Sequence, residues 1–494
     1  MSSELINEQT NTQSSSSSSH DTNNQNNDGV ITDTSSSTTS FSVQNRFINS
    51  NVRVTDQFCD SNGTYYVYHF INCDEKSDPE HIQTRGVIRF SADHNPNNGV
   101  VVCKTFDFTP EFFSSQKDDI IVHINNLVGV RCDTLNFYDA EESTLIRLWH
   151  HNNKWRISTH KRFNAYESYW SSSTSHGELF EQAIIYQAKN GSLKDEFKTE
   201  NDNEILDVYY NLLDTNKIYT FSVRTNENNR IVCFPEDHPT IYFAGEFDSK
   251  TFNLLTTNTS FISRPASHSF QQMIEVFEYL SNLDPFKKQG LMVYHFNSNN
   301  NTSAVIKLTT ENYRQFADVR NNVMSLTTRY YQIRKNADVL TKFLVLYPYM
   351  NNLIDMIENV LTIIINNILS KYMARFVRRN ADGTRDFVTL PPEQWYVAKQ
   401  LHELYLQDNQ RYRISQQLVR NFIDNMEPQY VENLVVKEMQ RAQSYINIQM
   451  QSLYNLVTVD NQNVTQEEQK EQENTNNQTT TEITTQTTTD QSSK

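Results

Sequence analysis

The hydrophobic periodicity of this 494-residue chain changes near residue 326, and this change limits what the chain can fold into. From about 47 to 325, short runs of Val, Ile, Phe and Tyr are separated by polar turns, a pattern typical of β-strands. The expected strands are 65–71, 86–90, 100–105, 120–124, 145–149, 155–158, 218–223, 230–234 and 291–296. Residues 151–154 are expected to form a hairpin tip. Helical stretches at 177–189 and 269–283 interrupt the strands, so the pattern predicts an α+β domain rather than a doubly wound parallel sheet.

After residue 326 the apolar residues follow helical spacing. Val339, Phe343, Leu346 and Met350 begin a one-sided apolar stripe that continues to Ile368. Pro348 is expected to break or kink this helix. Further helices are expected at about 392–406 and 415–455. The sequence therefore predicts a helical domain over 326–460, joined to a first domain over 47–325.

The two ends of the chain are polar and acidic. Residues 1–45 carry five acidic residues and no Lys or Arg, and residues 461–494 carry six acidic residues against two basic ones. Segments this poor in apolar residues cannot bury enough surface to offset chain entropy. We therefore expect disordered tails over 1–46 and 461–494.

Charge and cysteine usage exclude several classes of protein. The net charge of −16 argues against non-specific coating of nucleic acid, which needs clustered Lys and Arg, although a local basic groove stays open. Five scattered cysteines fit a reducing compartment with free thiols. No signal peptide is recognisable, and the apolar run at 360–369 is shorter than a membrane span. We expect a soluble intracellular protein, in the host cytoplasm or a virion if it is viral.

Several segments, taken in order, resemble the phage-type RNA ligases. Glu142–Arg147, a hairpin and Ser158–Arg162 resemble the region around the nucleophile of that family. The other matching segments are Thr84–Phe90, Cys103–Phe108, Glu111–Phe113, Asn229–Val232, Gln289–Val293 and Val305–Leu308. The resemblance covers roughly residues 50–320, and the whole chain also looks similar to giant-virus proteins with this ligase-like region. It implies a nucleotidyltransferase fold and ATP-dependent adenylyl transfer with Mg²⁺ to RNA ends.

The departures from the ligase pattern fall on the reacting groups. In the register set by Thr144, the family's nucleophilic lysine falls at Ala140, whose methyl group cannot form a phosphoramidate. The glutamate expected six residues before Asn229 falls at Val223, and the one expected before Gly290 is Gln289. Three losses fall on one reaction, so the resemblance implies a degenerate enzyme.

The residues that survive are mostly those that would hold an anion. The resemblance predicts nucleotide or phosphate contacts by Glu142, Thr144, Lys161, Arg230 and Lys307. Each has a simpler alternative: Lys161 at a solvated strand edge, and Arg230 or Lys307 in a structural ion pair.

If catalysis survives, Lys161 or Lys154 on the adjacent strand is the candidate nucleophile. No cluster of His, Cys and Asp has metal-site spacing, and no phosphate-binding P-loop or nucleophile elbow occurs. The metal ligands are therefore left unassigned.

A basic group in the helical half is a second candidate for binding RNA. Lys371 and Arg375 share a helix face with Arg378 or Arg379. Cations at a helix C-terminus also interact favourably with the helix dipole, which is the alternative explanation.

We expect an RNA-ligase-like protein that binds nucleotide or RNA ends and has lost catalysis. The alternatives are an active ligase with a relocated nucleophile, and a structural or virion-associated protein without enzymatic activity.

Overall fold

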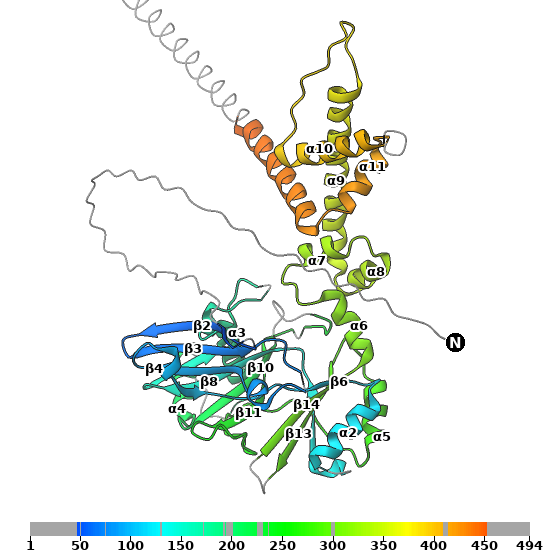
Figure 1. Ribbon diagram of the computed structural model, residues 1–494. Helices are drawn as coiled ribbons and strands as arrows, with labels where there is room; N and C mark the ends of the chain where they lie inside the picture. Colours follow the sequence, from blue (N-terminus) through cyan, green and yellow to red (C-terminus); the bar gives the residue numbers. More distant parts are fainter. Residues whose placement is uncertain are drawn as a thin grey trace, which may run out of the picture. The chain divides into compact units, whose positions relative to one another are not determined.

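The computed structural model describes residues 47–451 except 50, 75, 129–130, 171, 191–192, 194–200, 225–230, 236, 298–301 and 409–412. Both predicted tails and Arg230 lie outside the described residues. The described part combines three β-sheets with helices, so the predicted mixture of α and β structure is confirmed (Figure 1). Neighbouring strands are antiparallel except for one parallel pair, which also fits the α+β prediction.

The first sheet is an antiparallel meander at the start of the described chain. Its strands, in spatial order, are β1 (Phe47–Asn49), β2 (Val52–Asp60), β3 (Gly63–Phe70), β4 (Arg85–Ser91) and β5 (Val100–Cys103). One face of β3 and β4 contributes Tyr65, Val67 and Ile88 to a shared core with Trp149 of the second sheet. The first sheet therefore packs on the second.

The second sheet has the order β11-β10-β8-β9. Its strands are β8 (Thr144–His151), β9 (Lys154–Ser158), β10 (Lys217–Arg224) and β11 (Thr240–Asp248). Asn152 and Asn153 link β8 to β9 with φ of 52° and 57°, as a type I′ hairpin turn requires, so the predicted hairpin tip is confirmed. Helices α3 (His176–Lys189) and α4 (Asp202–Leu212) bury the far face of this sheet.

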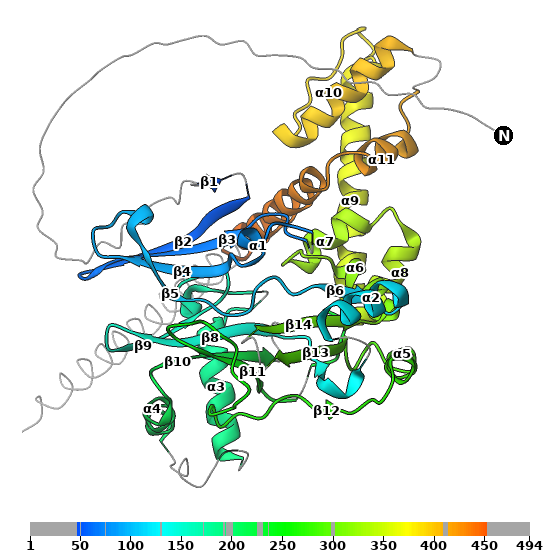
Figure 2. The same cartoon turned by 60° about the horizontal axis from the view of Figure 1, so that its bottom comes forward.

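The third sheet has the order β12-β7-β13-β14-β6. Its strands are β6 (Glu111–Phe113), β7 (Leu135–Ala140), β12 (Ser267–His268), β13 (Gly290–Asn297) and β14 (Thr302–Thr309). Helices α2 (Lys117–Val128) and α5 (Met273–Ser281) cover one face through a core that includes Phe137, Leu291 and Leu308. The other face carries Tyr138, Met292 and Tyr294, which share a core with Trp149 and Ile218 of the second sheet. Figure 2 shows β13 and β14 beside the strands of the second sheet.

Two predicted strands are wrong. Residues 120–124 lie in helix α2, where Ile120 and Ile124 are buried one turn apart while Val122 is exposed. Short apolar runs are ambiguous between strand and helix, and Asp118 and Asp119 in the first turn favour the helix. In the described part of 230–234 no strand forms. The carboxylate of Glu142 accepts from the backbone N–H groups of Val232 and Cys233, which a neighbouring strand would otherwise bind.

The helices after residue 310 share one hydrophobic core, which also contains Val232 and Cys233. They are α6 (Glu311–Arg320), α7 (Leu326–Ile333), α8 (Ala337–Leu346), α9 (Asn351–Tyr372), α10 (Pro392–Gln407) and α11 (Gln416–Asp424), followed by helical residues 428–451. Pro348 lies in a short 3₁₀ turn between α8 and α9, so the predicted break is confirmed. Arg334 joins three helices by ion pairs to Glu358, at 2.7 Å, and Asp424, at 2.5 Å.

Among the described residues one helical segment, Pro348–Val377, is long and apolar enough to cross a membrane by length and composition. It is longer than the apolar run expected from the sequence. On one face of this segment the side chains of Ile357, Leu361, Ile364 and Ile368 are buried in the core of the helical cluster, whereas Met356 and Ile363 are exposed.

Candidate functional site

A cavity of about 280 Å³ lies between the third sheet and β11 of the second sheet. It brings together residues far apart in the sequence: Ala140 at the end of β7, Gln289 just before β13, and Lys307 on β14. Gln289 and Lys307 lie in two of the segments that resemble ligase motifs, and Ala140 is the position of the family's lysine in the register set by Thr144. The volume is near the lower end of that of small-molecule sites.

The floor of the cavity depends on a close pairing of β7 with β13. Ala140 pairs with Gly290, and the backbone N–H of Gln289 donates to the Ala140 carbonyl oxygen at 3.2 Å. Gly290 has a φ of 157°, and a Cβ there would lie 1.9 Å from the carbonyl oxygen of Leu308. Glycine is therefore required where β7, β13 and β14 meet. Ala140 is almost fully buried and offers only a methyl group.

Lys307 is the lysine that lines this cavity, and its ammonium nitrogen lies 3.1 Å from a carboxylate oxygen of Glu111. The same oxygen accepts a hydrogen bond from the hydroxyl of Thr309 at 2.6 Å. Lys307 therefore both lines a cavity and forms an ion pair, which are the two placements considered for it from the sequence. The ammonium group is held in place and remains a quarter exposed.

Aromatic rings from β7, β11 and β13 and a second cation form one wall of the cavity. The guanidinium of Arg264 lies 4.6 Å from the ring centre of Phe243, with Tyr138 at 5.2 Å and Tyr294 at 5.3 Å. It also donates to the carbonyl oxygen of Ala244 at 2.9 Å. Such contacts between a cation and aromatic faces fix the guanidinium without neutralising it. The wall therefore combines flat apolar surface with positive charge.

Arg85 contributes a third cation to the cavity. It donates to the hydroxyl of Thr109 at 2.9 Å and to the carbonyl oxygen of Asp107 at 3.2 Å. Burial, and secondarily the nearby charge of Arg147, lower the pKa of Arg85 to about 10. The guanidinium is still charged at neutral pH, in a setting where an anion would be bound strongly.

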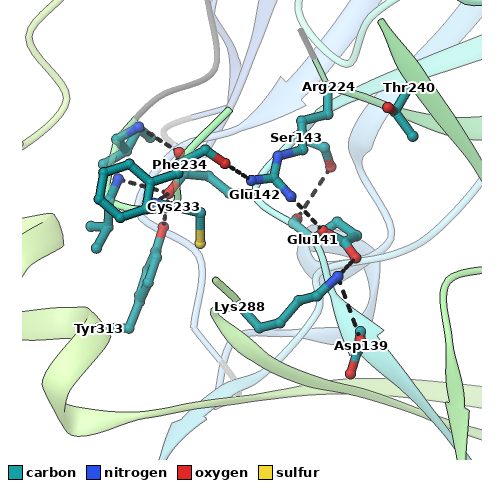
Figure 3. A network of polar contacts seen from close by, with 12 residues as sticks. Asp139, Glu141, Glu142, Ser143, Arg224, Cys233, Phe234, Thr240, Lys288 and Tyr313 are labelled. Atoms are coloured by element: carbon teal, nitrogen blue, oxygen red, sulfur yellow. Dashed lines mark hydrogen bonds and ion pairs between the residues drawn. The ribbon is translucent and has the colours of Figure 1, made fainter. Parts of the chain in front are cut away.

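Buried ion pairs surround the end of β7 (Figure 3). The carboxylate of Glu141 accepts from Arg224 at 3.0 Å and contacts the ammonium of Lys288, which also lies 3.5 Å from Asp139. Asp139 accepts further hydrogen bonds from the hydroxyl of Tyr279 at 3.0 Å and contacts His268 at 2.7 Å. These contacts fix the strand end that carries Ala140.

Glu142 has a different place from the one predicted for a nucleotide ligand, because it is not among the cavity-lining residues. Its carboxylate accepts from the backbone N–H groups of Ile231, Val232 (2.8 Å) and Cys233 (3.0 Å), and from the hydroxyl of Tyr313 at 3.0 Å. Burial raises the pKa of Glu142, although all four hydrogen bonds favour the charged form. The carboxylate thus ties the end of β7 to the core of the helical cluster, as Figure 3 shows.

The other predicted residues divide between separate places. Thr144 and Lys161 line a second cleft, of about 530 Å³, and Lys154 is exposed at the start of β9. Neither candidate nucleophile lines the cavity next to Ala140. Val223 is a core residue of the second sheet.

In the helical half, Arg375 stacks on Trp395, at 5.0 Å from the ring centre, and on Phe387, at 5.4 Å. It lies in a π-helical turn that follows α9, and Lys371 lies in the last turn of α9. Arg378 and Arg379 are exposed directly after this turn. The four residues of this basic group therefore follow one another along the end of one helix.

The carboxylates of the cavity are poorly suited to hold a divalent metal. Each is neutralised by a cation: Glu111 by Lys307, Asp139 by Lys288 and Glu141 by Arg224. Among the described residues no group of three His, Cys, Asp or Glu side chains could hold a metal ion. Magnesium bound by protein carboxylates alone does not fit this donor set.

Sequence reasoning missed Arg264 as a site residue and treated Arg85 only as part of a strand. Arg264 precedes Pro265 in an irregular segment, where no periodicity indicates which way a side chain points. Arg85 begins the Arg-Gly pair of β4, and that pair was the signal that could have placed it in the site.

Comparisons with known proteins point to viral relatives. No family model matches the chain. The chain is 22% identical over 314 residues to an immediate-early protein ICP-46 homolog of Invertebrate iridescent virus 6, covering 61% of this chain and 67% of the relative. It is 27% identical over 268 residues to the ICP-46 homolog of Invertebrate iridescent virus 3, covering 54% of this chain and 53% of the relative. The chain thus matches about half to two thirds of the length of these relatives.

Solved structures similar to this chain include ligases. A putative ATP-dependent DNA ligase from Aquifex aeolicus has a TM-score of 0.33 and 11% identity, covering 65% of this chain and 78% of that one. An archaeal ATP-dependent RNA ligase has a TM-score of 0.33 and 8% identity, covering 59% and 68%. A Naegleria gruberi RNA ligase mutant with AMP and Mn has a TM-score of 0.27 and 10% identity, covering 42% and 58%.

Proposed function

We propose that this protein is a degenerate nucleotidyltransferase resembling the phage-type RNA ligases, which binds a nucleotide such as ATP without forming a covalent adduct. The observation that carries the proposal is the meeting of Ala140, Gln289 and Lys307 around one cavity. These positions were matched to three separate ligase motifs from their order in the sequence. A chance resemblance gives no reason for the three segments to converge, whereas a shared fold does.

The side chains of the cavity suit binding better than catalysis. Lys307, Arg85 and Arg264 offer positive charge to phosphate groups, and the rings of Tyr138 and Tyr294 offer apolar surface to a base. Covalent transfer needs an amine at the floor, where Ala140 presents a methyl group. The cavity carboxylates are paired with cations, so a bound nucleotide would bring its own metal ion.

RNA ends are the proposed partner, and the basic group of the helical half is proposed to contact RNA phosphates. Arg378 and Arg379 are exposed, and Arg375 is held between aromatic rings, which leaves its charge available. The similarity to iridescent-virus proteins supports a viral origin, with the protein in the host cytoplasm or the virion.

Two measurements on the full chain test the proposal. Isothermal titration with ATP and Mg²⁺ should give saturable binding at one site. Incubation with radiolabelled ATP and Mg²⁺, followed by denaturing electrophoresis, should give no covalent label. A label that acid removes would contradict loss of catalysis and favour a relocated nucleophile at Lys161 or Lys154. Absence of ATP binding up to millimolar concentration would contradict the proposal and favour a structural or virion role.

A further inference from the structure

We call the cavity lined by Ala140, Gln289 and Lys307 the nucleotide cavity. A second cleft, of about 530 Å³, lies beside it and shares Arg85 with it. We call it the basic cleft. Its lining carries cations and aromatic rings, among them Arg85, His160, Lys161, Arg162, Tyr169 and Trp170. Within the described residues no Asp or Glu lines it. A cleft with cations and no lining acid attracts anions in a protein that is acidic overall.

A tight turn after β9 presents the cations of the basic cleft. The hydroxyl oxygen of Thr159 accepts from the backbone N–H groups of Lys161, at 3.3 Å, and Arg162, at 3.1 Å. The backbone of this turn approaches Gly86, where φ is 65° and a Cβ would lie 2.6 Å from the His160 carbonyl oxygen. The backbone of the turn is therefore fixed against β4, and with it the backbone position from which the side chain of Lys161 extends.

Beneath the turn lies a buried cation without a carboxylate partner among the described residues. Arg147 of β8 is fully buried and donates only to carbonyl oxygens, those of Gly86 and Thr159. Its Nε atom is buried and has no hydrogen-bond partner in the described part of the chain. A buried, uncompensated guanidinium is costly, and here it adds positive potential to the floor of the cleft.

Two buried imidazole nitrogens at the cleft also have no partner in that part of the chain. They are Nδ1 of His69 and Nε2 of His160. Burial, followed by the nearby charges of Lys161, Arg85 and Arg147, lowers the pKa of His69 to about 3, and the pKa of His160 is also lowered. Buried polar atoms are almost always paired in folded proteins, so these two nitrogens are exceptions that lie just behind the surface of the cleft.

Two acidic side chains near the cleft, Asp56 and Glu178, could repel an anion. Asp56 lies 3.6 Å from Arg162 and compensates that cation. Glu178 closes a capping box at the N-terminus of α3, whose first residue, His176, lines the cleft. Lys161 has no ion-pair partner among the described residues and is exposed. Positive charge therefore remains in excess at Lys161, Arg85 and Arg147.

We propose that the basic cleft binds a phosphate group of a single-stranded polynucleotide, with a neighbouring base stacked on Tyr169 or Trp170. The inference rests on the proposed function in one respect: Arg85, which lines both sites, would contact the polynucleotide in the cleft and a nucleotide in the cavity. Tyr169 is about half exposed and stands at the edge of the cleft, as a stacking surface requires. A free phosphate ion would leave these aromatic residues unused.

The test is fluorescence anisotropy of the full chain with a labelled single-stranded RNA of twelve nucleotides, with either a 5′-phosphate or a 5′-hydroxyl. The wild type should bind the RNA at 50 mM salt. Lys161→Ala should weaken binding about tenfold and lower the salt slope by about one. Lys154→Ala is the matched control, because it removes an exposed lysine at the start of β9, on the strand that leads into the turn of Lys161 but outside the cleft. It should leave the affinity within twofold of the wild type.

The two RNAs separate the sources of the phosphate. A preference for the 5′-phosphate that Lys161→Ala abolishes assigns a terminal phosphate to the cleft, and equal binding assigns an internal phosphodiester. Equal affinities for Lys161→Ala and Lys154→Ala, or no RNA binding by the wild type, would overturn the proposal. Tyr169→Ala should weaken RNA binding several-fold and leave thermal stability unchanged. If ATP does not bind but Lys161→Ala still weakens RNA binding, the nucleotide cavity fails as a site and the basic cleft stands.

Discussion

The nucleotide cavity and the basic cleft share Arg85 but treat their charges differently. In the cavity, Lys307 pairs with Glu111, and Arg264 stacks on three rings. In the basic cleft, Lys161 has no ion-pair partner in the described part of the chain, and nitrogens of His69 and His160 are buried without hydrogen bonds. The polar atoms of the cavity therefore have hydrogen-bond partners within the described residues, although Arg85 and Arg264 keep their charge, whereas some buried atoms of the cleft lack such partners there.

The largest expected effect concerns the support behind the cavity. Glu142→Ala should lower the free energy of unfolding by about 3 kcal/mol or more, because it leaves three backbone N–H groups and the hydroxyl of Tyr313 without their acceptor. Urea denaturation followed by circular dichroism measures this. Glu80→Gln, at an exposed position on α1 (Pro79–Ile82), is the control and should change stability by less than about 0.5 kcal/mol. A small effect at Glu142 would mean that the carboxylate does not hold the segment at 231–233.

The second prediction concerns the pH dependence of stability that His69 of the basic cleft produces. His69 has a pKa of about 3 in the folded protein, below its ordinary value of 6.5, because burial and the charges of Lys161, Arg85, Arg147 and Arg53 disfavour its protonation. As pH falls below 6.5, His69 is protonated in the unfolded chain but stays neutral in the folded protein. The unfolded state is therefore favoured, and the free energy of unfolding falls. Between pH 6.5 and 5 the loss should be about 2 kcal/mol.

His69→Phe keeps a ring of similar size and should remove that part of the pH dependence. Thermal unfolding at pH 7.5, 6.5 and 5 compares the two proteins. Identical pH profiles for wild type and variant would show that the pKa of His69 is not lowered by burial and the neighbouring cations, which would break the contrast between the two sites.

A third prediction separates the two sites by ligand. Lys307→Ala should weaken ATP binding about tenfold, or about 1.4 kcal/mol, because it removes a fixed cation from the cavity. The same change should alter RNA affinity less than threefold. Lys161→Ala should show the reverse pattern. Isothermal titration and anisotropy on both variants provide the comparison, and equal losses of both ligands in either variant would mean that the two sites are one.

The smallest effect is expected in the helical half. Replacing Arg378 and Arg379 together by Ala should weaken RNA binding about threefold, because exposed cations make screened contacts to phosphates. Lys399→Ala together with Lys335→Ala removes two exposed lysines of the helical half and serves as the charge-matched control. A loss as large as that of Lys161→Ala would move the main RNA contact from the cleft to the helices.

Local patterning determined much of this fold in advance. The hairpin at Asn152 and Asn153, the break at Pro348 and the apolar face of α9 follow from positive φ, a missing N–H and helical spacing, which are properties of neighbouring residues. The order of the ligase-like segments also singled out Ala140, Gln289 and Lys307. Local rules failed at 120–124, where an apolar run fits either a strand or a helix.

Only the tertiary structure decided what the site is made of. Glu142 was expected to face a nucleotide and instead binds backbone N–H groups of a distant segment, because the docking of 231–233 against α6 decides where its carboxylate points. Arg264 enters the cavity from an irregular segment that carries no periodic signal. The basic cleft brings together His69, Arg85 and Lys161, which are far apart in the sequence, so local patterns cannot reveal it.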